Sequence, residues 1–358
     1  MNIVFFNPYA DSDVKGAARR IFFLKSLLDG GEIPTRIVLR DDYARARKGI
    51  LEKLALCCGL RRLGYFLHAC ALSSEVGTIV ISEVIFTPTW RRSFILTIHD
   101  LKAFDTKASR GGALRRWSYL WFARLASNLV VVSQSVKNDL QKHCQVLPDK
   151  IHVIPNGISR DRVQRARQSH SQVKQFDFIY VSSFASHKRF EMLVRVAPAG
   201  ARLCLVGRDL GSLASVQEAV RERGTEISVA IRLDVDTDEE LFRLMGTSRC
   251  GVFPSVFEGF GIPLLEYCAV GLYVMASDIP PFLELAQYVD RFIRADDAVA
   301  WSKAMEEFLA SNPLPKPGMA EEVERGAFGE EAIGLKLHQL LRGAAEKIRP
   351  EDRAGSVQ

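Results

Sequence analysis

The sequence predicts an α/β protein built from two doubly wound halves, each with its own parallel sheet. Short apolar runs recur between segments of helical periodicity, and they are continuous rather than alternating, as in strands buried on both faces. The length of 358 residues suits two domains better than one. Both observations favour the same fold class.

The apolar runs give eleven expected strands. In the first half they are residues 3–6, 35–39, 77–82, 94–99, 128–133 and 151–155. In the second half they are residues 176–182, 201–207, 226–233, 250–255 and 272–277. Each half therefore reads as a Rossmann-like sheet, and we expect the two domains to face each other across a cleft, because ligands of open α/β sheets bind at the carboxyl ends of the strands.

The expected boundary lies in the polar stretch 156–175, which has little apolar periodicity and precedes a new strand. We therefore expect an N-terminal Rossmann-like domain over 1–165 and a C-terminal Rossmann-like domain over 166–335. Residues 336–358 are expected to form a helix at the domain junction and a flexible tail.

Composition narrows the class of protein. The N-terminus lacks the basic region and long apolar run of a signal peptide, and no stretch approaches 18 uninterrupted apolar residues. The seven cysteines are odd in number and have no CxxC spacing, which argues against a disulfide framework or a zinc site. These features predict a cytoplasmic protein.

Charge is divided unevenly between the halves. Residues 1–165 carry 26 Lys+Arg against 14 Asp+Glu, whereas residues 166–358 carry 22 against 28. A basic half joined to an acidic half suggests that the first half meets something anionic.

The most informative stretch is "FPSVFEGFGIPLLEYCAVG" at 253–271, where two glutamates flank a glycine turn that opens a helix. Glycines allow a ligand to approach the main chain, and the free N–H groups of Phe260, Gly261 and Ile262 at a helix N-terminus favour a phosphate. Carboxylates near a phosphate make sense if they accept hydrogen bonds from sugar hydroxyls instead. The stretch therefore predicts a nucleotide-sugar site.

The wider pattern resembles the retaining GT-B glycosyltransferases of family 4, also called glycosyl transferases group 1. The frame "FPSVFEGFGIPLLEYCAVGLYVMASDIP" is similar to their E-x7-E signature, with Glu258 and Glu266 as the pair. Other stretches follow the family order: "TIHDL" (97–101), "VVVSQSVKNDL" (130–140), "KIHVIPNGI" (150–158) and "YVSSFASHKRFEMLV" (180–194). The resemblance covers essentially the whole chain and implies the GT-B fold. It also implies that the domain over 1–165 binds the acceptor and that the domain over 166–335 binds the nucleotide sugar.

The resemblance also implies roles for individual residues. Glu266 is similar to the residue that binds the donor ribose, and Glu258 to the one that contacts the donor sugar, with the amides from Gly259 to Ile262 holding phosphate and sugar. Lys188 resembles the basic residue that grips the diphosphate, and His99 the residue near the reacting sugar. Gly16 falls where the family has a glycine turn before its first helix.

Two positions depart from the family pattern. Ser183 stands where the family usually has an arginine, five residues before the lysine, so Arg189 or Arg208 would have to supply a second cation to the diphosphate. The turn at Gly16 has one glycine where two are common. An alternative therefore stays open, a catalytically degenerate GT-B protein that binds a nucleotide sugar or a partner transferase without turnover.

Other ligands fit the sequence less well. The "DVDTD" stretch (234–238) contains an Asp-x-Asp pattern, but Thr237 and Glu240 there form a capping box at a helix start, and the family resemblance implies no bound metal or other cofactor. No G-x-G-x-x-G follows a strand, which argues against a dehydrogenase, and no nucleic-acid-reading motif is present.

Two basic stretches, 45–72 and 107–127, interleave Arg and Lys with large apolar side chains. In the second, Leu114, Trp117, Leu120 and Trp121 fall at helical spacing. Such a helix can lie on an anionic membrane surface, or it can be an ordinary core-facing helix with a charged outer face. We keep both interpretations, the first of which makes the protein peripheral to the cytoplasmic face of the inner membrane.

The expected reaction is transfer of a hexosyl unit from a nucleotide sugar to a hydroxyl of a glycan or lipid-linked glycan in bacterial surface polysaccharide assembly. The resemblance implies retention of configuration and front-side attack. GDP-mannose is the first expectation for the donor, and UDP-sugars are the next.

Overall fold

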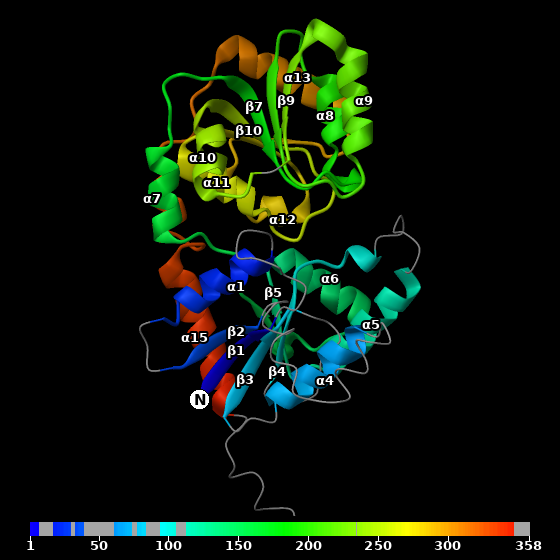
Figure 1. Ribbon diagram of the computed structural model, residues 1–358, viewed down its shortest axis with the longest axis vertical. Coiled ribbons are helices and arrows are strands. Elements are labelled where there is room, and N and C mark those ends of the chain that lie inside the picture. Colours follow the sequence, from blue (N-terminus) through cyan, green and yellow to red (C-terminus); the bar gives the residue numbers. More distant parts are fainter. Residues whose placement is uncertain are drawn as a thin grey trace, which may run out of the picture. The chain divides into compact units, whose positions relative to one another are not determined.

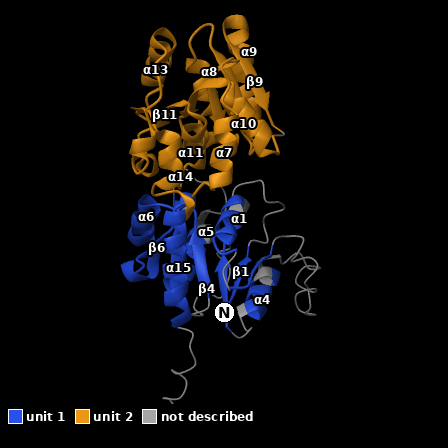
Figure 2. Cartoon of the chain, turned by 90° about the vertical axis from the view of Figure 1, so that its left-hand side faces the viewer, with its two compact units in different colours: residues 1–156, 331–358 blue, residues 157–330 orange. Residues whose placement is uncertain are grey.

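The apolar runs form two all-parallel sheets, one in each half of the chain. The computed structural model describes residues 1–6, 17–29, 33–38, 61–73, 77–83, 94–104, 112–233 and 235–346. The chain divides into unit 1, residues 1–156 with 331–358, and unit 2, residues 157–330 (Figure 2). The division falls at 156/157 rather than at the expected 165/166, because helix α7 (Arg160–Gln168) packs against other helices of unit 2.

Unit 1 is built on a six-stranded parallel sheet in the order β2-β1-β3-β4-β5-β6 (Figure 1). Its strands are β1 (Asn2–Phe6), β2 (Thr35–Val38), β3 (Thr78–Ser82), β4 (Phe94–Ile98), β5 (Asn128–Val131) and β6 (Ile151–Val153). Its described helices are α1 (Ala17–Ser26), α4 (Arg61–Ser73), η1 (Lys102–Phe104), α5 (Gly112–Leu125), α6 (Gln134–Cys144), η2 (Pro148–Lys150) and α15 (Glu330–Glu346). All six strands expected for this half are present.

Alternate residues of β1 and β3 bury opposite faces of this sheet, as the strand period of two requires. One face carries Ile3 and Phe5, which pack in a core cluster with residues of α1 and α15. The other face carries Val4 and Phe6, which pack with residues of α4. The C-terminal helix, expected at the domain junction, therefore contributes to the core of unit 1.

Unit 2 has a second six-stranded parallel sheet, in the order β12-β11-β10-β7-β8-β9. Its strands are β7 (Phe176–Val181), β8 (Arg202–Val206), β9 (Ser228–Arg232), β10 (Ser248–Phe253), β11 (Tyr273–Ser277) and β12 (Arg291–Ile293). Its other helices are η3 (Ser186–Lys188), α8 (Phe190–Val196), α9 (Leu213–Arg223), η4 (Gly224–Glu226), α10 (Asp238–Gly246), α11 (Ile262–Val270), α12 (Pro280–Leu283), η5 (Ala286–Tyr288), α13 (Ala298–Ser311) and α14 (Met319–Arg325). β12 is the one described strand that the sequence did not predict, because its apolar run is only Phe292 and Ile293 between two arginines.

Helix starts follow the local sequence. Thr237 caps α10, accepting a hydrogen bond from the Glu240 N–H at 3.2 Å, as the capping box predicted. Ser133 caps α6 in the same way, through the N–H of Val136. Within the described part of the chain, no helix combines the length and the apolar character needed to cross a membrane.

Candidate functional site

The glycine turn before α11 can be built only with glycine at its last position. Gly261 has φ +110°, and a Cβ there would lie 2.6 Å from the ring of Phe282. Pro263 follows in the first turn of the helix, where its missing N–H costs no hydrogen bond. The strand-turn-helix order predicted from the sequence is thus confirmed. A helix N-terminus of this kind favours an anion, because its first N–H groups lack partners within the helix.

The turn is tied to the loop that carries Lys188. The Nζ of Lys188 forms an ion pair with the Oε1 atom of Glu258, and Ser255 Oγ donates to the same oxygen at 2.8 Å. The next residue after Ser255 adds a backbone contact, in which the N–H of Val256 donates to the carbonyl oxygen of His187 at 3.0 Å. The Lys188 and Glu258 side chains are each 11% exposed, so two predicted site residues lie together in a nearly buried pair.

The hydroxyl of the buried Tyr180 contacts both segments that carry this pair. The Tyr180 hydroxyl donates to the Lys188 carbonyl oxygen at 3.0 Å and lies 2.9 Å from Ser255 Oγ. Burial, and next the charge of Glu258, raise the pKa of Tyr180 well above its usual range, so the hydroxyl keeps its proton and stays a donor. No feature of the sequence pointed to this role, because Tyr180 lies inside an apolar strand run.

Glu266 lies in a second buried pair. Its Oε1 accepts a hydrogen bond from Nη2 of Arg162 at 2.6 Å, and Nη1 of the same arginine lies 3.0 Å from Oδ2 of Asp238. The Arg162 guanidinium also lies 5.3 Å from the ring centroid of Phe242. Sequence reasoning singled out Glu266 but not Arg162, which comes from α7, 104 residues earlier.

Phe260 and the backbone around Ser183 are also fixed by packing. Phe260 is buried and meets Phe328 edge-on, with ring centroids 5.4 Å apart. After Ser183, the N–H of Phe184 donates to the Arg208 carbonyl oxygen at 2.8 Å. Gly207 approaches this segment so closely that a Cβ there would lie 1.6 Å from the Ser182 carbonyl oxygen.

Arg189, one of the two expected substitutes for the missing arginine, is bound to the loop after β12. Arg189 adopts a left-handed backbone conformation between η3 and α8, and its Nη1 donates to the carbonyl oxygen of Ala295. Arg189 is therefore already engaged in holding the loop after β12.

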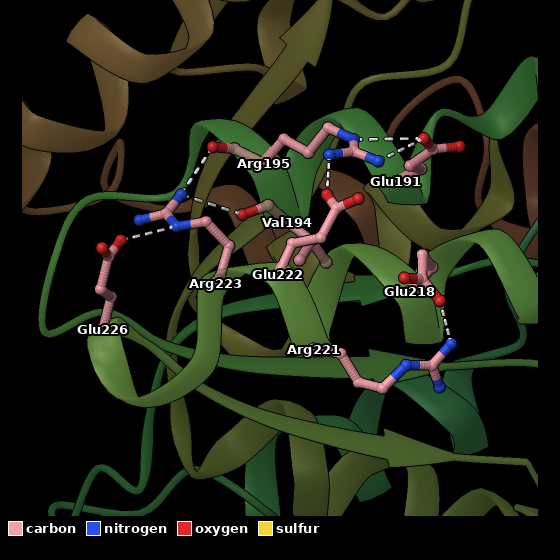
Figure 3. Close-up of polar contacts among 8 residues, drawn as sticks. All are labelled: Glu191, Val194, Arg195, Glu218, Arg221, Glu222, Arg223 and Glu226. Atoms are coloured by element: carbon pink, nitrogen blue, oxygen red, sulfur yellow. Dashed lines mark hydrogen bonds and ion pairs between the residues drawn. The ribbon is translucent and has the colours of Figure 1, made fainter.

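The arginines that follow on α8 and α9 are engaged with acidic partners (Figure 3). Arg195 pairs with Glu191 at 3.1 Å and with Glu222, Arg221 pairs with Glu218, and Arg223 pairs with Glu226 at 2.9 Å. Lys188, in contrast, is a predicted diphosphate cation whose side chain pairs with Glu258 beside the glycine turn.

In unit 1, the partly exposed His99 contacts a buried carboxylate, which in turn lies near a buried arginine. Its Nε2 pairs with Oε2 of Glu83, whose side chain is 2% exposed. Burial alone would raise the pKa of Glu83, but His99, and then Arg20, hold it below its usual value. Arg20 in turn donates to the carbonyl oxygens of Ile154 and Pro155, each at 2.9 Å, and burial lowers its pKa to about 10.

Glu83 and Arg20 were not anticipated from the sequence. Glu83 directly follows β3 and His99 directly follows β4, and because these strands are parallel neighbours, their carboxyl ends bring the two side chains together. Gly16, the remaining predicted site residue, lies outside the described residues.

Asp238, the last residue of the Asp-x-Asp stretch, forms its ion pair with Arg162. Among the described side chains, no group of three or more His, Cys, Asp or Glu is placed to hold a metal ion.

With this geometry in view, comparison with known proteins defines the class. Residues 162–322 match the family model for glycosyl transferases group 1, and residues 81–162 match the model for glycosyltransferase family 4. The chain belongs to the GT-B glycosyltransferases of family 4, as its sequence signature predicted.

Curated relatives are distant and matched in part. The O-antigen chain mannosyltransferase RfbU of Salmonella typhimurium is 26% identical over 60% of this chain and 60% of its own length. A GDP-mannose:cellobiosyl-diphosphopolyprenol alpha-mannosyltransferase of Komagataeibacter xylinus is 28% identical over 63% of this chain and 58% of its own length. The chain thus spans about three fifths of these relatives.

Solved structures agree on the fold. Sucrose-phosphate synthase of Thermosynechococcus elongatus matches with a TM-score of 0.73 at 19% identity, covering 97% of this chain and 99% of that one. HepE of Anabaena, solved with UDP-glucose, matches with a TM-score of 0.65 at 15% identity, covering 96% and 100%. At these identities the likeness establishes the GT-B fold alone.

Proposed function

We propose that the protein is a retaining glycosyltransferase that moves a hexosyl unit, in the first place mannosyl, from a nucleotide sugar to a hydroxyl of a glycan or lipid-linked glycan. The observation that carries this proposal is the Lys188–Glu258 pair at the glycine turn before α11. A cation, a carboxylate and a helix N-terminus there offer one partner each to a diphosphate, a sugar hydroxyl and a phosphate. The acceptor would bind unit 1.

Lys188 would face a negative charge both before the donor binds and during the reaction. Before binding, it pairs with Glu258. A bound diphosphate would compete for Lys188 and release carboxylate lone pairs of Glu258 for the hydroxyls of the donor sugar. The departing diphosphate gains negative charge as the bond to the sugar C1 breaks, so a fixed cation stabilises the transition state more than the ground state.

The proposed transfer balances without a redox partner. The acceptor oxygen forms a bond to C1 on the face that the diphosphate leaves, and the acceptor proton passes to the leaving phosphate. His99, held by Glu83, would orient the reacting sugar. The proposal draws its positive charge from Lys188 and not from a metal ion, so activity is expected to persist in excess EDTA.

The donor proposal follows the relatives. Relatives from several bacteria are named as mannosyltransferases, two of the names specifying GDP-mannose or an O-antigen chain. GDP-mannose and a surface polysaccharide are therefore our first choices, and a UDP-sugar is the next, because HepE binds UDP-glucose on the same fold.

Helix α5 supports a peripheral contact with an anionic membrane. Trp117 and Trp121 are 51% and 52% exposed and stack on each other, with ring centroids 5.8 Å apart. Arg116 and Arg124 are exposed on the same helix, while Phe122 is buried. α5 thus combines a core-facing side with an aromatic and basic outer side, and we propose that the latter rests on the cytoplasmic face of the inner membrane.

The first test is a thermal-shift screen with GDP, UDP, ADP and their common sugar conjugates. A ligand at 100 times its dissociation constant adds about 2.7 kcal/mol to stability, which a melting curve resolves. A shift with one nucleotide names the donor class, and that donor is then used in transfer assays with wild type, Lys188→Met and the exposed control Lys303→Met. Absence of any nucleotide-dependent shift would contradict the proposed donor site.

One observation favours a second candidate. Ser183 replaces the usual arginine, and Arg189 is committed to the Ala295 carbonyl oxygen, so a protein that binds nucleotide sugar without turnover fits as well. Binding of the donor with neither transfer nor donor hydrolysis over a long incubation would favour this candidate. Slow but measurable turnover that Lys188→Met abolishes would favour the enzyme.

A further inference from the structure

Arg162 joins two carboxylates that come from two different helices. Its Nη2 donates to Oε1 of Glu266 on α11 at 2.6 Å, and its Nη1 contacts Oδ2 of Asp238 on α10 at 3.0 Å. The two sides of the guanidinium fork therefore have separate acceptors. Arg162 itself is contributed by α7, so three helices of unit 2 meet at this one side chain.

The position of the guanidinium is fixed in more than one way. Asp238 holds one nitrogen, and the Phe242 ring lies 5.3 Å from the guanidinium carbon. The Arg162 and Asp238 side chains are each 17% exposed. An arginine fork held by a carboxylate and an aromatic face has little freedom left, so it can impose an orientation on its second acceptor.

That second acceptor is the more deeply buried group. The Glu266 side chain is 2% exposed, and a buried carboxylate is costly unless it is paired and hydrogen-bonded. Arg162 supplies the opposite charge and fixes which carboxylate oxygen faces α7. Arg162 therefore constrains the orientation of the Glu266 carboxylate plane.

We propose that Arg162 is a positioning residue for Glu266 and thereby makes the donor site select ribonucleotides over 2′-deoxyribonucleotides. This inference rests on the proposed function, in which Glu266 accepts hydrogen bonds from the donor ribose. A carboxylate recognises vicinal hydroxyls only when both lone-pair directions are aligned with them, and a hydroxyl bonded to a charged acceptor changes affinity about 10- to 100-fold. Arg162 acts through Glu266 and does not touch the reacting atoms.

The experiment compares GDP with 2′-deoxy-GDP, or the corresponding pair for the nucleotide that the wild type prefers, by titration calorimetry. Wild type, Arg162→Met, Arg162→Lys and Arg165→Met are measured side by side. Arg165 is the matched control, because it lies on the same helix and near the same Asp238, at 3.8 Å. Melting curves establish that each variant is folded, and Arg162→Lys, which keeps the charge, serves if Arg162→Met does not fold.

We expect wild type and Arg165→Met to prefer the ribonucleotide at least about tenfold, and Arg162→Met to lose most of that preference. Arg162→Lys is expected to lie between them. In steady-state assays, Arg162→Met should raise the donor KM with little change in kcat, since the ribose contact is made equally in ground and transition states.

The failures are distinguishable. If the wild type binds a nucleoside diphosphate and discriminates against the deoxy form, but folded Arg162→Met or Arg162→Lys discriminates equally well, Arg162 is a structural pair only and the inference is overturned. If the wild type binds but shows no preference for ribose, Glu266 is not the ribose acceptor and the inference falls with that assignment. If the wild type binds no nucleoside diphosphate, the proposed function itself is contradicted.

Discussion

Two regions of unit 2 are rich in ion pairs, yet they differ in burial. On α8 and α9 the pairs stand in solvent, and the Arg195 and Glu222 side chains are 44% and 45% exposed (Figure 3). Around α11 the pairs are nearly closed off, with 11% exposure for Lys188 and Glu258 and 2% for Glu266. Water screens the first set and scarcely reaches the second, so a misplaced charge costs more around α11 than on α8 and α9.

The difference in burial between these ion pairs indicates where functional residues are to be expected. Exposed pairs contribute little and can be exchanged freely, whereas buried pairs persist only when every partner is satisfied. Among the described residues, buried pairs lie after β10 and on α11 in unit 2 and after β3 and β4 in unit 1, and each of these places contains a residue that the sequence marked for donor or sugar contact. The pairs of Asp177 on β7 with Arg202 and Arg249 are also buried at the carboxylate and contain no such residue.

The largest expected effect is on turnover. Lys188→Met should lower the transfer rate about 10²- to 10³-fold, equivalent to roughly 3–4 kcal/mol of transition-state stabilisation, as for loss of an oxyanion donor. Lys303→Met removes a lysine that is 74% exposed and should leave the rate unchanged. A Lys188→Met enzyme as fast as the wild type would mean that the pair with Glu258 is structural.

The buried contact between Glu83 and His99 is expected to contribute to the stability of unit 1. Glu83→Gln removes the charge shared by His99 and Arg20 and should lower the free energy of unfolding by about 1.5–3 kcal/mol, the range for hydrogen bonds to charged groups. Urea unfolding measures this loss. The control Asp29→Asn breaks an exposed pair with Lys25, and an equal loss there would show that burial does not separate the two kinds of pair.

Much of this architecture could be predicted from contiguous sequence. The strands appear in the sequence as apolar runs, and Glu258, the glycine turn and Glu266 all lie within nine consecutive positions, from 258 to 266. Caps such as Thr237 are equally local, because donor and acceptor lie three residues apart. What these features share is that the chain itself fixes the distance between the interacting groups.

The partners that complete the site could not be predicted in that way. Arg162 reaches Glu266 across 104 residues, and Tyr180 reaches Ser255 across 75, so neither pairing leaves a periodic trace. Glu83 meets His99 only because β3 and β4 are neighbours in register. Such contacts depend on strand order, which the hydrophobic pattern does not contain.

A third prediction concerns acid. Burial alone would raise the pKa of Asp177, but hydrogen bonds and charge from Arg202 and Arg249 hold it below its usual value of 3.8. A lowered carboxyl pKa stabilises the fold above the unfolded-state value, and this contribution is lost as the pH falls through the folded-state value. Wild-type melting temperature should therefore drop below about pH 4.

The variant Asp177→Asn should melt at a lower temperature at neutral pH, by about 2–4 °C for each kcal/mol lost, and should show a flatter acid limb. Asp296→Asn, at a side chain that is 77% exposed, is the control. A wild-type acid limb reproduced by Asp177→Asn would assign the acid sensitivity to other groups.

The smallest effect is expected for the exposed ion pairs on α8 and α9. Arg195→Ala removes an arginine of the α8–α9 surface that pairs with two carboxylates, those of Glu191 and Glu222. Because water and salt already screen these charges, neither the melting temperature nor the transfer rate should change measurably, and 0.5 M NaCl should not alter that result. A clear loss of stability would mean that the exposed network acts cooperatively, and the contrast between buried and exposed pairs would then need a different physical basis than solvent screening.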